Sequence, residues 1–141
     1  MDALARVARG VAVAMALVLG ACSSSADFDR AKEGVERFHE MFNGGTFDAI
    51  YSEAGKEFQA STPRDEFLQF VEAVHRKLGK AGEAKLRGWN VNYNTSGSYV
   101  TLTYATHYDE GDASEQFVFN VGGGKASLVG FHINSKVLIL K

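Results

Sequence analysis

The residue best able to do chemistry in this sequence is a single thiol near the N-terminus. Cys22 is the only cysteine of the 141-residue chain, so no intramolecular disulfide bond can form. It directly follows Leu19, Gly20 and Ala21, which are one aliphatic residue and two small ones. The role of this thiol has to be inferred from the segment that precedes it.

Residues 1–21 have the pattern of a secretory signal peptide. Arg6 and Arg9 precede an apolar run, Val11–Leu19, and two small residues end the segment. The apolar run is shorter than the roughly 20 residues that a membrane-spanning helix needs. We therefore expect residues 1–21 to be removed during export.

The segment Leu19-Gly20-Ala21-Cys22 resembles the bacterial lipobox. The resemblance implies cleavage between Ala21 and Cys22, diacylation of the Cys22 thiol with palmitate-like chains, and acylation of the new amine. One acyl chain binds a membrane only marginally, whereas two or three anchor a protein stably. The alternative is an ordinary secretory signal with an accidental cysteine, and the serines that follow Cys22 weigh against it.

The residues after Cys22 bear on localisation. Residues 22–26 are expected to form the lipidated cysteine and a short serine-rich tether, which keeps the domain close to the membrane of a bacterial cell envelope. Ser23 favours the outer membrane, facing the periplasm, in a cell that has one. An aspartate at that position would indicate retention in the inner membrane.

The four histidines are the next residues that could do chemistry. His107 and His132 fall on the sheet face opposite the aromatic residues, where a metal or an acid–base pair could form. The H-x-x-x-H and H-x-H spacings that hold a metal on one element are absent, so we interpret both as surface residues. His39 and His75 lie beside apolar helix stripes and are expected to be partly buried and hydrogen-bonded. We predict no metal site, no catalytic residue and no cofactor.

Three polar or glycine-rich segments are interpreted as turns. The acids of Asp109–Asp112 are too few and too close together for calcium. Gly122–Gly124 lacks the Lys-Ser/Thr of a phosphate loop, and Asn94–Ser96 matches a glycosylation sequon by chance. With 15 basic and 17 acidic residues the chain has no strongly basic stretch, so nucleic-acid binding is not expected.

Three helices are predicted in the first half of the mature chain. The first covers Asp27–Asn43, and a short second helix follows Thr46. Ser61 or Thr62 is expected to cap the third, with Pro63 in its first turn. Their apolar faces comprise Phe28, Ala31, Val35, Phe38 and Phe42 in the first helix, Phe47, Ile50 and Tyr51 in the second, and Phe67, Phe70, Val71, Val74 and Leu78 in the third.

After residue 83 the hydrophobic period changes from 3.6 to 2, which predicts four strands joined by the three turns. The apolar alternation comprises Trp89, Val91 and Tyr93, then Val100, Leu102, Tyr104 and Tyr108, then Phe117, Phe119 and Val121, and finally Val129, Phe131 and Ile133. We expect this face to pack on the helices, and the opposite face to meet solvent or a partner. Helices followed by an antiparallel meander indicate one α+β domain over residues 27–141.

The four aliphatic residues Val137–Leu140 are predicted to dock as a last strand buried on both faces, the alternative being an exposed contact patch.

A family resemblance emerges from the elements together. The segments that carry it are the helix Phe67–Leu78 and the strands Tyr99–Tyr104, Phe117–Phe119 and Val129–Ile133. Over most of residues 35–135 the chain resembles the bacterial family called domain of unknown function 4019. It departs from that pattern at Ala126 and Ser127, where an aromatic residue would be expected. The resemblance implies a curved sheet wrapped on helices, of the cystatin-like or nuclear-transport-factor-like kind, and brings no catalytic residues.

Two functions follow as hypotheses. The first is a membrane-anchored envelope lipoprotein whose domain is a non-enzymatic binding or accessory module. The second is a small enzyme or ligand carrier with a pocket between sheet and helices, for which Tyr51, Tyr93, Tyr104 and Tyr108 are the inward candidates.

Overall fold

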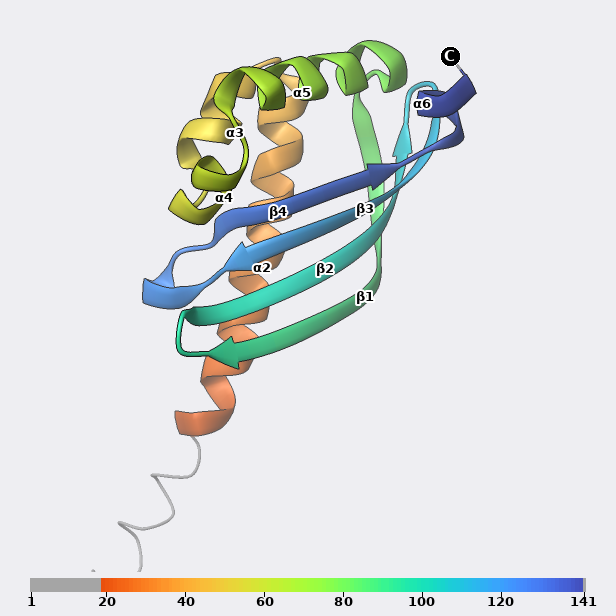
Figure 1. The fold of residues 1–141 in the computed structure, drawn as a ribbon. Coiled ribbons are helices and arrows are strands. Elements are labelled where there is room, and N and C mark those ends of the chain that lie inside the picture. The colour runs from red at the N-terminus through yellow and green to blue at the C-terminus, as the bar shows by residue number, and fades with distance from the viewer. Residues whose placement is uncertain (1–18, 141) are drawn as a thin grey trace, which may run out of the picture.

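The computed structural model describes residues 19–140, with side chains from Ser25 onward. The expected signal residues 1–18 lie outside the described residues, and so does the Cys22 thiol. The described part is α+β, with one four-stranded antiparallel sheet and five α-helices. Helix α2 crosses one face of the sheet, and α3, α4 and α5 gather on the β4 side (Figure 1). The predicted fold class is confirmed, although three helices were too few.

The long helix α2 (Leu19–Asn43) begins before the predicted start at Asp27. Residues 23–26, which were expected to form a tether, continue its backbone, because serine is tolerated in a helix. Of the predicted apolar stripe, Ala31, Val35, Phe38 and Phe42 are buried, whereas Phe28 is only partly buried. At the other end, the Asn43 side chain donates to the carbonyl of Ala81 (2.9 Å) and accepts from its N–H (2.8 Å), which fixes α2 to the start of the sheet.

Three helices follow, α3 (Phe47–Glu53), α4 (Lys56–Ser61) and α5 (Arg64–Leu78). The sequence predicts α3 and α5 but not α4, because a helix with the single buried residue Phe58 has no hydrophobic period to detect. The predicted start of α5 was also wrong. Pro63 stands immediately before its first turn, and neither Ser61 nor Thr62 caps it with a side chain.

The strands are β1 (Ala81–Asn94), β2 (Gly97–Tyr108), β3 (Gly111–Asn120) and β4 (Ser127–Asn134), paired in sequence order. This confirms the antiparallel meander. Alternate residues of the two central strands are buried against the helices. They are Val100, Leu102, Tyr104, Thr106 and Tyr108 in β2, and Ala113, Glu115, Phe117 and Phe119 in β3. The predicted inward face is thus confirmed for β2 and β3, with one charged residue in it.

The edge strand β1 departs from the expected packing. Trp89 pairs with Leu102 and Tyr93 pairs with Ser98, so both side chains lie on the inward face of the sheet. Nevertheless, Trp89 is 60% exposed and Tyr93 is 58% exposed. The helical layer does not extend over this part of β1, and the aromatic ring that meets Trp89 is Phe28 of α2, at 5.0 Å between centroids.

The C-terminal aliphatic segment forms the short helix α6 (Lys136–Leu140), so the predicted strand was wrong. Ser135 is buried. Its hydroxyl donates to the carbonyl of Asp112 (2.7 Å) and accepts from the N–H of Val137 (3.3 Å), which turns the chain away from the sheet after β4. Val137 and Leu138 pack partly on the core, whereas Ile139 and Leu140 are mostly exposed. Half of the segment therefore docks on the core and half remains exposed, as the two sequence-based alternatives each predicted for the whole segment.

Candidate functional site

A fully buried carboxylate is the most unusual polar feature of the interior. Glu115 lies on β3 with 0% of its surface exposed. Its Oε2 accepts a hydrogen bond from the Tyr108 hydroxyl at 2.8 Å, and its Oε1 lies 2.9 Å from Nε2 of His39. The pair His39–Glu115 joins α2 to β3, across 76 positions of sequence.

The surroundings of this carboxylate are apolar. The His39 ring meets Phe38 and Phe117 edge-on, at 6.0 and 5.8 Å between centroids. Removing a carboxylate from water costs several kcal/mol unless hydrogen bonds replace the lost hydration, and two partners do so here. Burial, and next the charge of Glu115, raise the pKa of Tyr108, so its hydroxyl remains a donor. The arrangement satisfies the buried charge from within the protein.

The sequence contains a signal for Glu115 that our interpretation missed. Glu115 occupies an inward position in the alternation that contains Phe117 and Phe119, so the period-2 pattern already buries it. His39 meets the expectation of a partly buried, hydrogen-bonded histidine. His75 meets the expectation only in part. Its ring packs against the rings of Phe42 and Phe47, and its buried Nε2 has no hydrogen-bond partner in the described part of the chain.

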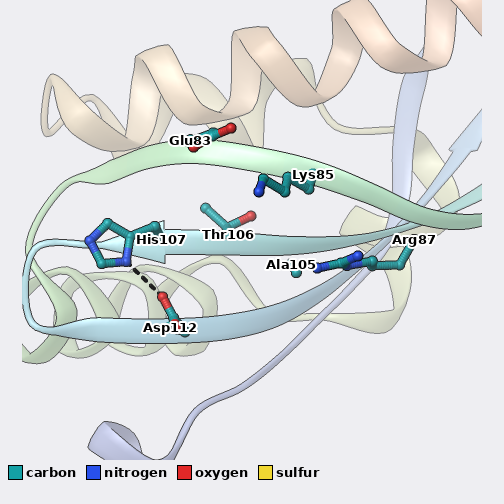
Figure 2. A pocket seen from close by; sticks show the side chains of 7 residues that line it. All are labelled: Glu83, Lys85, Arg87, Ala105, Thr106, His107 and Asp112. Atoms are coloured by element: carbon teal, nitrogen blue, oxygen red, sulfur yellow. Dashed lines mark hydrogen bonds and ion pairs between the residues drawn. The ribbon is translucent and has the colours of Figure 1, made fainter.

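A charged cleft of about 320 Å³ lies on the opposite face of the sheet (Figure 2). Its lining residues are Glu83, Lys85 and Arg87 from β1, Ala105, Thr106 and His107 from β2, and Asp112 from β3. Nδ1 of His107 lies 2.6 Å from Oδ1 of Asp112, and both side chains are largely exposed. With two cations, two carboxylates and an imidazole, this cleft offers ion pairs to a polar partner.

The structure does not bring His107 and His132 together. His107 pairs with Asp112 across β2 and β3, whereas His132 pairs with Gln116 across β3 and β4. Both lie on the predicted outer face. Among residues 25–140, no group of three or more histidine, cysteine, aspartate or glutamate residues is placed to hold a metal ion.

The four tyrosines considered for a pocket have different surroundings. Tyr104 and Tyr108 are buried. The hydroxyl of Tyr51 in α3 donates to the carbonyls of Gln59 in α4 and of Thr62 just after it, so it is used in helix packing. Tyr93 is exposed, contrary to the expectation that it points into the interior. The four side chains therefore do not line one common site.

The predicted turns are confirmed as local structures. Asp109 and Glu110 form the turn between β2 and β3, and in the turn between β1 and β2 Oδ1 of Asn94 accepts the N–H of Ser96 at 2.8 Å. Oδ2 of Asp109 also accepts the N–H of Lys80 at 2.8 Å, which joins the first of these turns to the start of β1. The glycine triplet Gly122–Gly124 forms a short 3₁₀ turn between β3 and β4.

Other hollows involve the helices. A charged one of about 390 Å³ lies between α2, α3 and the turn before β4, where its lining includes Arg30, Glu53 and Lys125. An apolar cleft of about 250 Å³ is lined by Phe58, Thr62, Glu66, Phe67, Phe70 and Phe131. A smaller hollow of about 50 Å³ lies where α2 and α3 meet the sheet, and its lining includes Phe38, Ile50, Phe119 and Leu128. This smaller hollow occupies the position where a ligand pocket between sheet and helices would open.

Cys22 is described through its backbone alone. Cys22 falls within the helical span of α2, while its side chain lies outside the described residues. None of the helices in the part of the chain described is long and apolar enough to cross a membrane. The chain matches no family model and none of the curated proteins with which it was compared.

Proposed function

We propose that this chain is a bacterial envelope lipoprotein, anchored by acyl chains on Cys22, that presents residues 27–141 as a non-enzymatic binding or accessory module. The observation that carries the proposal is the segment Leu19-Gly20-Ala21-Cys22 after a short apolar run. With Ser23 after the lipidated residue, the outer membrane, facing the periplasm, is the proposed location.

The first helix supports this arrangement. Its backbone is helical from Leu19 through Asn43, and at 1.5 Å per residue Cys22 lies about 9 Å before Phe28 along the helix axis. Acyl chains on Cys22 would therefore keep the domain within about 1 nm of the bilayer surface. The partner of the module would have to be reached from that position.

The finer fold assignment belongs to the same proposal. We infer a cystatin-like or nuclear-transport-factor-like cone, related to the domain of unknown function 4019, from the resemblance of the strand segments. The strongly bent β1 and β2, which curve around α2 in Figure 1, support a cone-shaped sheet.

Binding through the surface is favoured over chemistry in the interior. Two hollows lie between the sheet and the helices: one of about 50 Å³ beside α2 and α3, and the apolar cleft of about 250 Å³ beside α4 and α5. Both are smaller than the roughly 300 Å³ at which ligand pockets begin. Both oxygens of Glu115 already have partners. We assign partner binding to the charged cleft on the outer face of the sheet, where Lys85 and Arg87 are exposed.

The alternative is a small enzyme or ligand carrier, and the observation that favours it is the buried pair of Glu115 and His39. Such a protein would need the small hollow to widen. A saturable small ligand whose binding is abolished by Glu115→Gln, but not by Lys85→Glu, would establish the alternative. Loss of a cross-linked partner with Lys85→Glu alone would support the surface module.

The anchor is tested by mass spectrometry of the chain extracted in mild detergent from a bacterial envelope. The expected species begins at Cys22 and carries the mass of two or three acyl chains, and Cys22→Ala should accumulate as the uncleaved precursor. A mature chain with unmodified Cys22 would overturn the proposal. Ser23→Asp is the matched variant for location and should shift the protein from the outer to the inner membrane on density fractionation.

A further inference from the structure

An apolar surface remains uncovered where the inward face of β1 extends past the helices. Leu86, Trp89 and Tyr93 are exposed there, although the register sets them on the face that is buried in β2. Phe28 of α2 packs against Trp89. We call the group Phe28, Leu86, Trp89 and Tyr93 the Trp89 patch.

The position of the Trp89 patch relative to the first turns of α2 is its most informative property. Phe28 follows Cys22 by six residues of the same helix, which is about 9 Å of helical rise. In Figure 1 the N-terminal turns of α2 project past β1, on the side of the sheet away from α5 and α6. The patch and the proposed anchor therefore belong to the same end of the molecule.

The residue types suit a boundary between lipid and water. Tryptophan and tyrosine combine a large apolar ring with a polar N–H or O–H group, and they concentrate at membrane interfaces for this reason. The Lys32 ammonium lies 5.5 Å from the centre of the Phe28 ring, where it can reach phosphate groups beside an inserted ring. Burial of these rings would add to the hydrophobic free energy of the acyl chains.

A second copy of the chain that paired with the free edge of β1 would be a different occupant, and the structure of this edge argues against such pairing. The pairing of β1 is interrupted twice, between Ala81 and Ala84 and between Leu86 and Gly88. Such irregularities bend and twist an edge strand and discourage edge-to-edge pairing.

We propose that the Trp89 patch lies in the phospholipid headgroup region and orients the domain on the membrane. This inference rests on the proposed lipid anchor at Cys22. The acyl chains hold the chain at the bilayer, and the patch selects which side of the domain faces it. The charged cleft on the other sheet face then remains open to the periplasm.

The sequence supplies a probe for the test, because Trp89 is the only tryptophan. The mature lipidated protein would be reconstituted into phosphatidylcholine vesicles with brominated or ordinary acyl chains. Bromine should reduce Trp89 emission at least about twofold, since an interfacial indole touches the upper acyl chains. In the control, Trp89→Phe combined with Phe70→Trp moves the probe to α5, beyond β4, where 44% of Phe70 is exposed and no quenching is expected.

Flotation and bromine quenching distinguish docking of the Trp89 patch from anchoring through Cys22. Protein that floats with the vesicles but shows no bromine quenching of Trp89 would overturn membrane docking and leave the anchor standing. Protein that does not float would overturn the anchor, and docking with it. Shielding of Trp89 from aqueous iodide without bromine quenching, together with the mass of a dimer, would assign the patch to a second copy and overturn lipid docking.

Discussion

Removing the Tyr108 hydroxyl should show how much the buried carboxylate depends on its partners. In Tyr108→Phe, Oε2 of Glu115 loses the hydrogen bond of 2.8 Å, and water cannot replace it because Glu115 is fully buried. Hydrogen bonds to charged groups contribute about 1.5–3 kcal/mol, so we expect the free energy of unfolding to fall by about 2 kcal/mol. For a domain of this size that lowers Tm by roughly 6–10 °C.

The control for this prediction is Tyr104→Phe on the same strand. Tyr104 is also largely buried and on the same face, but its hydroxyl makes no hydrogen bond within the described residues. We expect its removal to change stability by no more than about 0.5 kcal/mol. Chemical denaturation followed by circular dichroism measures both variants.

A double-mutant cycle isolates the pair itself. In a Glu115→Leu background the Tyr108 hydroxyl has no carboxylate to bond, so Tyr108→Phe should cost at least about 1 kcal/mol less than in the native chain. Equal costs for Tyr108→Phe and Tyr104→Phe, or a cycle with no coupling, would refute the claim that Tyr108 stabilises the Glu115 charge.

Three further predictions concern the termini of elements and the titrating groups. Asn43→Ala should lower the free energy of unfolding by about 1–3 kcal/mol in denaturant titrations, because both backbone groups of Ala81 lose their partner. The hydrogen bond from Arg37 lowers the pKa of Glu53, so the stabilisation is fully present above the unfolded pKa of about 4.3 and is lost as pH falls through the lower pKa of the folded state. Arg37→Met should therefore lower Tm slightly at neutral pH, and this difference should shrink as the solution is acidified and Glu53 becomes protonated. Burial raises the pKa of Tyr108 in the folded state, so the free energy of unfolding should fall above about pH 10, where the unfolded tyrosine ionises. In denaturation curves measured at alkaline pH, the free energy of unfolding of Tyr108→Phe should fall less than that of the native chain.

The parts of the fold that sequence periodicity could predict are those with repeated burial. The stripe of α2 and the alternation of β2 and β3 each repeat an apolar residue at a fixed spacing, and each is buried as expected. The same logic misjudged β1, because alternation indicates which side chains share a face, not whether another layer covers that face. Trp89 and Tyr93 share the inward face and remain exposed.

The short helices and the long-range contact between His39 and Glu115 could not be predicted from the sequence, for a different reason. Helices α4 and α6 have one turn or little more, so neither presents a complete hydrophobic period. The contact between His39 and Glu115 depends on how α2 lies across β3, which no local pattern encodes. The inward position of Glu115, in contrast, could have been recognised from its strand neighbours.

The order in which the chain becomes available has a consequence for folding. Phe38 of α2 is covered by Phe117 of β3, at 5.1 Å between ring centroids, and Phe117 is synthesised much later. Phe42 of α2 can pack on Tyr108 once the β1–β2 hairpin has formed, whereas Phe38 has to wait for β3. A nascent chain therefore carries Phe38 without its aromatic cover until β3 has been made, and apolar surface exposed in this way makes a chain prone to aggregation.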